Sequence, residues 1–213
     1  ETRPEFVTGD VVKECLGDLD PGSGPVSFTL AMGLETSDDR IREKSIEKGF
    51  SFDDFVDASR TARRAGAGVK AYLLQKPPYL TEREAVDDVV RSVADAGPHA
   101  DALSLNPCTV QKGTEVERLW RARAYRPPYL WSVILALSRA GVPVTCDPVG
   151  AGTPRGPHNC PTCDRELVRG IRDYNLSADR TLLDALLALD CGCKKEWEFV
   201  LGAERPWCMP LTG

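Results

Sequence analysis

The stretch VSFTLAMGLETSDDRIREKSIEKGFSFDDFVDASRTARRAGAGVKAYLLQKPP, residues 26–78, decides the fold class. It begins with a continuous apolar run at residues 26–33, which predicts a buried strand. Apolar residues then recur at helical spacing over 52–65. VKAYLLQ, residues 69–75, predicts the next strand, which a pair of prolines stops. A strand, a helix and a strand in this order indicate a parallel sheet with crossover helices.

The same alternation continues in both directions along the chain. Further strands are expected at 101–106 and 142–148, and ETRPEFV, residues 1–7, reads as the end of another strand. Further helices are expected at 10–19, 38–47 and 81–96 and on both sides of the RPP break at 126–128. Thr81 and Glu84 have the spacing of a capping box. We therefore expect an α/β fold.

Composition and charge narrow the classes of function. With 42% hydrophobic and 28% charged residues, the chain of 213 residues has the balance of a globular protein with a real core. A net charge of −5 means that any binding to RNA has to come from a local basic face. The sequence has no apolar run of about 18 residues and no charged-then-apolar leader, so we expect a cytoplasmic protein without a membrane partner.

Polar side chains follow the predicted strands one after another. In parallel α/β barrels, functional groups collect at the carboxyl ends of the strands. The candidate site residues at these ends are Glu1, Arg3, Glu35, Gln75, Lys76 and Asn106, with Cys108 and Asp147 beside them. Chains commonly become polar where strands end, which explains part of this set. The recurrence at successive strand ends nevertheless favours a binding site.

Four cysteines form two close pairs. Cys160 and Cys163 make a CxxC in GPHNCPTCD, and Cys191 and Cys193 make a CxC in DCGC. Eight cysteines in a chain expected in the cytoplasm favour a metal over disulfides. Four thiolates in two pairs suit a tetrahedral zinc ion or an iron–sulfur cluster, and the spacing leaves both open.

The other metal candidates are less favoured. His158 either binds the metal or hydrogen-bonds a loop, and Cys208 is an optional extra ligand. Cys15 and Cys146 read as core or near-core residues, and Cys108 is ambiguous at its strand end.

The composition changes at the glycine- and proline-rich link GAGTPRGP, just before the first cysteine pair. Two helical stretches, about 165–173 and 177–189, separate the two pairs. The tail from Lys194, which ends in PWCMPLTG, is a poor candidate for a helix or strand. We expect a sheet domain over residues 1–152 and a small, mostly helical, cysteine-rich metal-binding region over 153–213.

Several motifs resemble radical S-adenosylmethionine (radical SAM) enzymes. The stretch from GLETSDD to LLQKPP is similar to one in enzymes of the elongator-acetyltransferase and coproporphyrinogen-oxidase type. Its parts are a glycine–apolar–Gln/Glu–Ser/Thr motif after a strand, then a helix, a basic–glycine–aromatic turn and another helix. LSLNPCTVQKGTEVERLWRARAYRPPYLWS and VTCDPVGAGTPRGPHNCPTCD match more narrowly the radical SAM subunits of archaeosine synthase. The resemblance covers essentially the whole chain.

The resemblance implies that residues 1–152 are the C-terminal part of a partial (β/α)6 radical SAM barrel. Such a barrel holds S-adenosylmethionine on a [4Fe-4S] cluster, and reductive cleavage gives a 5′-deoxyadenosyl radical that abstracts a hydrogen atom. In the archaeosine family the substrate is a lysine-bearing deazaguanine in tRNA, and breaking a C–N bond leaves archaeosine. The implied function is that of a tRNA-modifying lyase that works with a partner subunit of archaeosine synthase.

The resemblance also assigns residues to cofactor binding, and it assigns no catalytic residue. Carried over by motif, the cofactor-binding residues are Glu1, Arg3, Glu35, Gln75, Lys76 and Asn106, with Thr2 and Lys112 beside them. Carboxylates and amides suit the ribose hydroxyls and the amino group of such a cofactor. Arginine and lysine suit a carboxylate or a phosphate.

One departure from the family is large. The CxxxCxxC signature, which supplies the ligands of the radical-generating cluster, occurs nowhere in the 213 residues. We expect it upstream of Glu1, with the first strands of the barrel, or on a separate polypeptide. The missing N-terminal barrel segment is therefore an expected partner.

Two arginine-rich segments bear on RNA binding. RLWRARAYRPP, residues 118–128, interleaves arginines with two aromatic residues and suits a tRNA backbone, although a solvated helix face explains this segment better when it is taken alone. Arg165, Arg169 and Arg172 form a second stripe at helical spacing. The alternatives left open are a non-catalytic metal-stapled module that binds tRNA or a partner subunit, and another radical SAM reaction on the same barrel.

Overall fold

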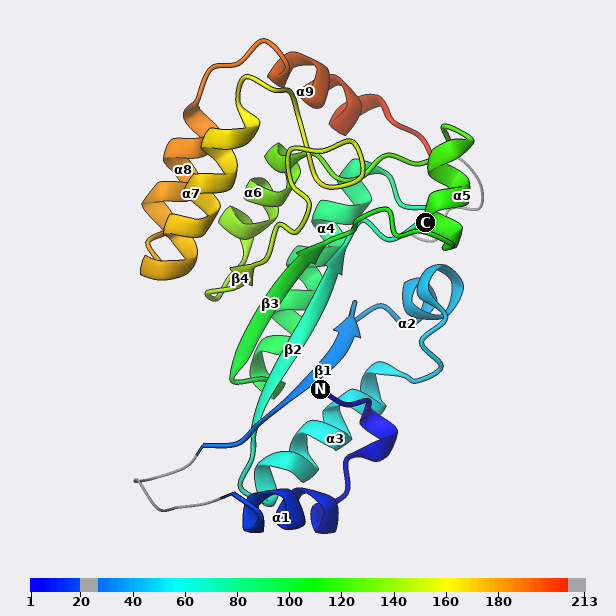
Figure 1. Ribbon diagram of the computed structural model, residues 1–213, viewed down its shortest axis with the longest axis vertical. Helices are drawn as coiled ribbons and strands as arrows, with labels where there is room; N and C mark the ends of the chain where they lie inside the picture. The colour runs from blue at the N-terminus through cyan, green and yellow to red at the C-terminus, as the bar shows by residue number, and fades with distance from the viewer. Residues whose placement is uncertain (20–26, 207–213) are drawn as a thin grey trace.

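A parallel four-stranded sheet forms the centre of the computed structural model, which describes residues 1–19 and 27–206 (Figure 1). Its strands are β1 (Thr29–Glu35), β2 (Gly68–Gln75), β3 (Ala102–Pro107) and β4 (Thr145–Cys146). All neighbouring strands are parallel, in the order β1-β2-β3-β4. Helices lie between successive strands, so the expectation of an α/β fold with crossover helices is confirmed.

The described helices are η1 (Pro4–Phe6), α1 (Gly9–Gly17), α2 (Asp39–Ile41), η2 (Arg42–Ile46), α3 (Phe52–Arg64), α4 (Glu82–Ala96), η3 (Gly97–His99), α5 (Glu115–Arg121), α6 (Leu130–Arg139), α7 (Asp164–Ser177), α8 (Arg180–Ala188) and α9 (Lys194–Ala203). The predicted capping box of α4 is present: the Thr81 hydroxyl accepts from the Glu84 N–H, and the Glu84 carboxylate accepts from the Thr81 N–H at 2.8 Å. Such a box satisfies two backbone donors that the helix leaves open.

One face of the sheet is buried under helices, and the other face is open. Along β2, Val69, Ala71 and Leu73 are fully buried, whereas Lys70 and Tyr72 between them are partly exposed. Successive side chains of a strand point to opposite faces, so the two sets lie on opposite sides of the sheet. The buried set packs with apolar residues of α3, α4 and α6 in one hydrophobic cluster. The open face is therefore available to line a site.

Helices α7, α8 and α9 pack around α6 at one end of the molecule (Figure 1). The rings of Trp131 on α6 and Trp197 on α9 lie 6.2 Å apart, and the Trp197 indole donates to Ser132 Oγ at 2.8 Å. A Cβ at Gly170 on α7 would meet the Leu186 side chain of α8 at 2.6 Å, so a larger residue at this position would force Leu186 to move. Trp131, Trp197 and Leu186 belong to the same cluster as the sheet core.

Two strand predictions were too long. In the predicted strand at 1–7, only Thr2 makes a bridge, to Met32, because Pro4 lacks an N–H and the chain turns into η1. In the predicted strand at 142–148, only Thr145 and Cys146 pair with β3. Prolines flank that pair on both sides and prevent a longer ladder.

The expectation of no regular element in the tail was wrong for its first part. The tail forms α9 from Lys194 onward, and Trp197 is the buried residue that anchors this helix to the core. The run PWCMPLTG lies outside the described residues except for its first proline. In the described part of the chain, no helix is both long enough and apolar enough to cross a membrane. The domain boundary expected near residue 153 remains a prediction.

Candidate functional site

The open face of the sheet lines a cleft of about 1280 Å³. Its floor consists of side chains that alternate along the strands: Ala31, Gly33, Glu35, Lys70, Tyr72, Ser104, Asn106 and Thr145. Its walls come from the start of the chain, from the turn before α3, from the end of β4 with the loop after it, and from α7: Glu1, Thr2, Arg3, Phe6, Lys48, Cys146–Ala151, Val168, Arg172 and Asn175. Glu35 and Asn106 come from the carboxyl ends of their strands, the usual place for functional groups in such sheets.

Glu35 forms an ion pair with Lys48 in this cleft. Lys48 Nζ lies 2.7 Å from Glu35 Oε1, and the two side chains are 26% and 15% exposed. Arg3 donates to the backbone carbonyl of Lys48 at 2.6 Å. Gly33 leaves room for the pair, since a Cβ there would lie 2.7 Å from Glu35 Oε1 and 2.9 Å from Lys48 Nζ. The absence of a side chain at Gly33 therefore shapes this end of the cleft.

The backbone at Glu35 is strained. Its φ is +69°, in the left-handed region that L-residues rarely adopt, and the pairing of β1 with β2 shifts register between Gly33 and Glu35. The fully buried Arg42 holds this turn, because it donates to the carbonyls of Leu34, at 3.2 Å, and of Thr36. Strained conformations that the surroundings enforce are concentrated at functional sites.

The structure brings four of the six predicted cofactor residues together in the cleft and places the other two elsewhere. The four are Glu1, Arg3, Glu35 and Asn106. Gln75 is fully buried on the helix-covered face, and its side-chain amide has no hydrogen-bond partner among the described residues. Lys76 is buried in an ion pair. Asp147 also lines the cleft.

Lys76 connects the end of β2 to two helices. Its Nζ lies 2.6 Å from Glu82 Oε2, and the two side chains are 4% and 0% exposed. The other Glu82 oxygen accepts from the Tyr129 N–H at 2.8 Å, and the Tyr125 hydroxyl donates to the Lys76 carbonyl at 2.8 Å. A buried pair with this many partners stabilises the fold only while both charges remain.

Lys48 lines the cleft but was not selected from the sequence. It stands in Lys48-Gly49-Phe50, the basic–glycine–aromatic turn of the resemblance. The guanidinium groups of Arg3 and Arg42 lie over the Phe50 ring, at 5.9 and 5.3 Å from its centroid. The turn motif was therefore the signal that pointed to Lys48.

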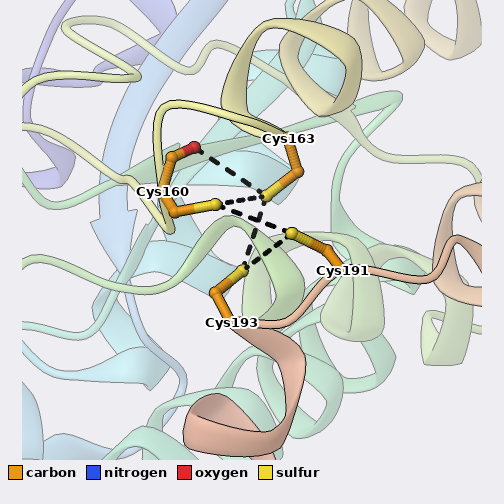
Figure 2. Close-up of side chains that lie close together, drawn as sticks. All are labelled: Cys160, Cys163, Cys191 and Cys193. Atoms are coloured by element: carbon orange, nitrogen blue, oxygen red, sulfur yellow. Dashed lines mark hydrogen bonds between the residues drawn. The ribbon is translucent and has the colours of Figure 1, made fainter.

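The four predicted metal ligands converge on one point (Figure 2). The Sγ atoms of Cys160–Cys163, Cys160–Cys191 and Cys163–Cys193 are 3.6 Å apart, and those of Cys191–Cys193 are 3.5 Å apart. All four sulfurs lie within 4.8 Å of one another. Thiolates that share one tetrahedral zinc ion, at about 2.3 Å each, lie roughly 3.8 Å apart. The donor set and its spacing therefore fit a single metal ion.

Two helices begin at the sulfur cluster. Cys163 is the N-cap residue of α7, and Cys193 is the N-cap residue of α9. The positive end of each helix dipole favours a thiolate. The Asp164 side chain accepts a hydrogen bond from the Asn159 N–H at 2.7 Å and stabilises the turn that carries Cys160 and Cys163. The fold of this region thus brings the four sulfurs together at the starts of two helices.

His158 lies apart from the four sulfurs. Its Nδ1 is 2.8 Å from the carbonyl of Gly156, which matches the loop role considered for it, and burial lowers its pKa. Cys208 lies outside the described residues.

The thiols of the cluster differ in acidity. Burial acts to raise the pKa of Cys160, but hydrogen bonds from neighbouring backbone and thiol groups outweigh it, and the pKa falls to about 7. Burial raises the pKa of Cys193 to about 11 and also raises the pKa of Cys163. A metal that binds all four as thiolates therefore has to displace protons from the more buried ones.

The described cysteines outside the cluster are of a different kind. Cys146 is fully buried and Cys108 nearly so, and burial raises the pKa of both thiols. Cys15 is partly buried. Cys108 and Cys146 have the environment of structural cysteines rather than reactive ones.

Comparisons with known proteins agree with this architecture. No protein-family model matches the chain. Archaeosine synthase subunit beta from Methanosarcina acetivorans is 48% identical over 209 residues, which is 96% of this chain. The protein of the same name from Thermococcus kodakarensis is 41% identical over 207 residues, 94% of the chain.

The chain is a homologue of archaeosine synthase subunit beta. The archaeosine synthase subunits are longer: this chain spans 58% of the length of the M. acetivorans protein and 62% of the T. kodakarensis protein. The resemblance to the archaeosine synthase family, predicted from the motifs around Asn106 and Cys160, is confirmed.

A solved structure extends the comparison from the archaeosine synthase subunits to the fold. Methanocaldococcus infernus Elp3 with an N-terminal deletion (residues 1–46) superposes with a TM-score of 0.57 at 16% identity. The match covers 82% of this chain and 41% of the Elp3 chain. At this identity the likeness concerns the fold alone. The fold expected from the resemblance to the elongator-acetyltransferase type is confirmed.

Proposed function

We propose that this chain is part of a radical SAM lyase that forms archaeosine in tRNA, and that its cleft holds S-adenosylmethionine beside the tRNA nucleoside. The observation that carries the proposal is the 48% identity to an archaeosine synthase subunit beta over 96% of the chain. The cleft supports it, because polar groups from several strands meet on the open face of the sheet. The relatives are named as subunits, so we propose that a partner subunit takes part.

The residues of the cleft fit the proposed cofactor. The Glu35 carboxylate accepts hydrogen bonds from an amino group or ribose hydroxyls, and the Asn106 amide both donates and accepts. Arg3 suits the carboxylate of S-adenosylmethionine. Bound S-adenosylmethionine would supply the radical that starts cleavage of the C–N bond in the lysine-bearing deazaguanine. The ion pair with Lys48 holds the Glu35 side chain in position in the cleft.

The proposal assigns this chain no ligands for the radical-generating cluster. No CxxxCxxC motif occurs among the 213 residues, and the cysteine quartet has a different spacing. We propose that the quartet binds one structural zinc ion. The four ligands of a [4Fe-4S] cluster each bind a different iron and have to stand further apart than sulfurs that share an ion. The separations of 3.5 and 3.6 Å between neighbouring sulfurs favour the single ion.

The test replaces the matching part of a related protein with this chain. In M. acetivorans, this chain is substituted for the aligned part of subunit beta, and archaeosine is measured in tRNA hydrolysates by mass spectrometry. We expect archaeosine to be made, and we expect Glu35→Gln to lower it at least tenfold. Glu14→Gln, an exposed position on α1, is the matched control and should change nothing. A stable hybrid protein that makes no archaeosine, beside a native subunit that does, would refute the proposal.

A further inference from the structure

Helix α7 carries a row of three arginines on its exposed side. Arg165, Arg169 and Arg172 follow one another at i, i+4 and i+7, which places them on one face of a helix. All three are exposed, whereas the opposite face buries Leu167, Ile171 and Tyr174, among other residues, in the core. The row spans about 10 Å along the helix axis.

No described carboxylate forms an ion pair with these three arginines, although Glu166 and Asp173 belong to the same helix. Within residues 1–19 and 27–206, none of them makes an ion pair or a hydrogen bond. The other arginine-rich segment differs: Arg118 pairs with Glu115, and Arg121 pairs with Glu117. Arg165 and Arg169 are like charges one turn apart, which destabilises an isolated helix, whereas Glu166 and Asp173 stand three and four residues from Arg169 and offset part of that effect.

The row leads from the sulfur cluster to the cleft. Arg165 is two residues beyond Cys163, at the start of α7. Arg172, near the other end of the row, lines the cleft together with Val168 and Asn175 of the same helix. An anionic polymer that lies along the row therefore reaches the cleft at its end.

We propose that the row on α7 binds the phosphates of an RNA strand and guides its nucleoside into the cleft. This deepens the proposed function and rests on it. The guanidinium fork matches phosphate oxygens in two parallel hydrogen bonds. Because the net charge of the chain is −5, electrostatic attraction of RNA has to come from local clusters of basic residues such as this row. We favour RNA over an acidic surface of a partner protein because the last arginine of the row, Arg172, lines the cleft.

The experiment measures binding of transcribed tRNA to the full natural protein that contains this chain, over a salt series. The variant is Arg165→Glu/Arg169→Glu, which leaves Arg172 in the cleft unchanged. Arg60→Glu/Arg64→Glu on α3 is the control, because it changes the charge equally at the same i, i+4 spacing on a helix that does not line the cleft. We expect the Kd of the α7 variant to rise at least tenfold. We also expect the slope of log K against log salt to fall by about one to two units, since each lost phosphate contact removes just under one.

The outcomes separate the two proposals. Unchanged affinity in the α7 variant, or an equal loss in the α3 control, overturns the arginine row and leaves the proposed function standing. Absence of tRNA binding by the unmutated protein overturns both. Normal tRNA binding with lost association to a partner subunit assigns the row to that protein instead. Arg165→Lys/Arg169→Lys guards against misfolding, because it keeps the charge and should retain most of the salt dependence.

Discussion

Lys48 Nζ lies 2.7 Å from Glu35 Oε1, across the position of β1 that has no side chain. The pair joins a turn that precedes α3 to the end of the first described strand. Arg42 holds the same strand end from the buried side, through the carbonyls on either side of Glu35. The carboxylate is therefore fixed both by its backbone and by its counter-ion before any ligand binds.

Gly33→Ala should disturb this end of the cleft far more than it disturbs the fold. The new Cβ would lie under 3.0 Å from both members of the ion pair, and both are the ends of flexible side chains that can move away. We expect S-adenosylmethionine affinity, measured by calorimetry, to fall at least tenfold with a small change in Tm. Gly202→Ala on α9, where an added Cβ meets nothing, is the control. Equal affinity in both variants would mean that the pair does not shape the cofactor site.

The sulfur cluster should hold one zinc ion per chain. We expect metal analysis of protein purified without oxygen to give about one zinc and no matching iron and sulfide. Cys160→Ala and Cys191→Ala should each lose the ion, and a chelator should lower the Tm of the unmutated protein but not of the variants. Cys15→Ala, outside the cluster, should keep the zinc. Iron with equimolar sulfide would show instead that the quartet holds a cluster.

Breaking the ion pair between Lys76 and Glu82 should destabilise the fold strongly. Lys76→Met leaves a carboxylate that is 0% exposed without its counter-ion, and the expected loss is about 3–5 kcal/mol in the free energy of urea unfolding. The double variant Lys76→Met/Glu82→Leu should regain much of this, because it removes both charges. A single variant as stable as the parent would mean that the pair is not buried in solution.

Asp88 should make the protein less stable as the pH rises. Burial raises the pKa of its carboxyl from 3.8 to about 6, against the opposing effect of hydrogen bonds from Thr36 and Arg91. The folded state therefore holds the proton more tightly, and this contribution is complete below about pH 4 and is lost as the pH rises through about 6. Its size is roughly 3 kcal/mol. Asp88→Asn should reduce the change in the free energy of unfolding between pH 4 and pH 7. Denaturant unfolding of parent and variant over that range measures this change. A parallel pH dependence in parent and variant would contradict this assignment.

Periodicity predicted the elements whose signals are local. The alternation over residues 69–75 and the capping box at Thr81 both appear in the structure nearly as expected. The strand at Thr145 and Cys146 was predicted at the right place but too long, because its apolar run looks like a longer strand until the flanking prolines are considered. Helix α9 escaped because its stability comes from Trp197 packing against α6, a contact that no local pattern encodes.

The parts of the candidate site that follow from sequence spacing were easier to predict than the parts that depend on the folded chain. All four cysteines that meet in the structure were identified from the sequence, because the CxxC and CxC spacings are recognisable without a structure. At the strand ends, Glu35 and Asn106 were found, but Gln75 lies on the opposite face, because the side chains of a strand alternate and a strand end alone does not fix the face. Lys48 is brought to the cleft by a turn, and only the motif around Gly49 hinted at it.

The sulfur cluster also closes a ring in the chain. An ion held by Cys163 and Cys191 ties together the two ends of a segment that contains all of α7 and α8. If the ion stays bound when the rest of the chain unfolds, the conformational freedom of that segment is reduced, by about 3–4 kcal/mol if the closure acts as a disulfide around a loop of this length does. The helix pair then starts refolding with its ends already together. With an ion held there, this segment would therefore lose less chain entropy when it folds than the same segment without one.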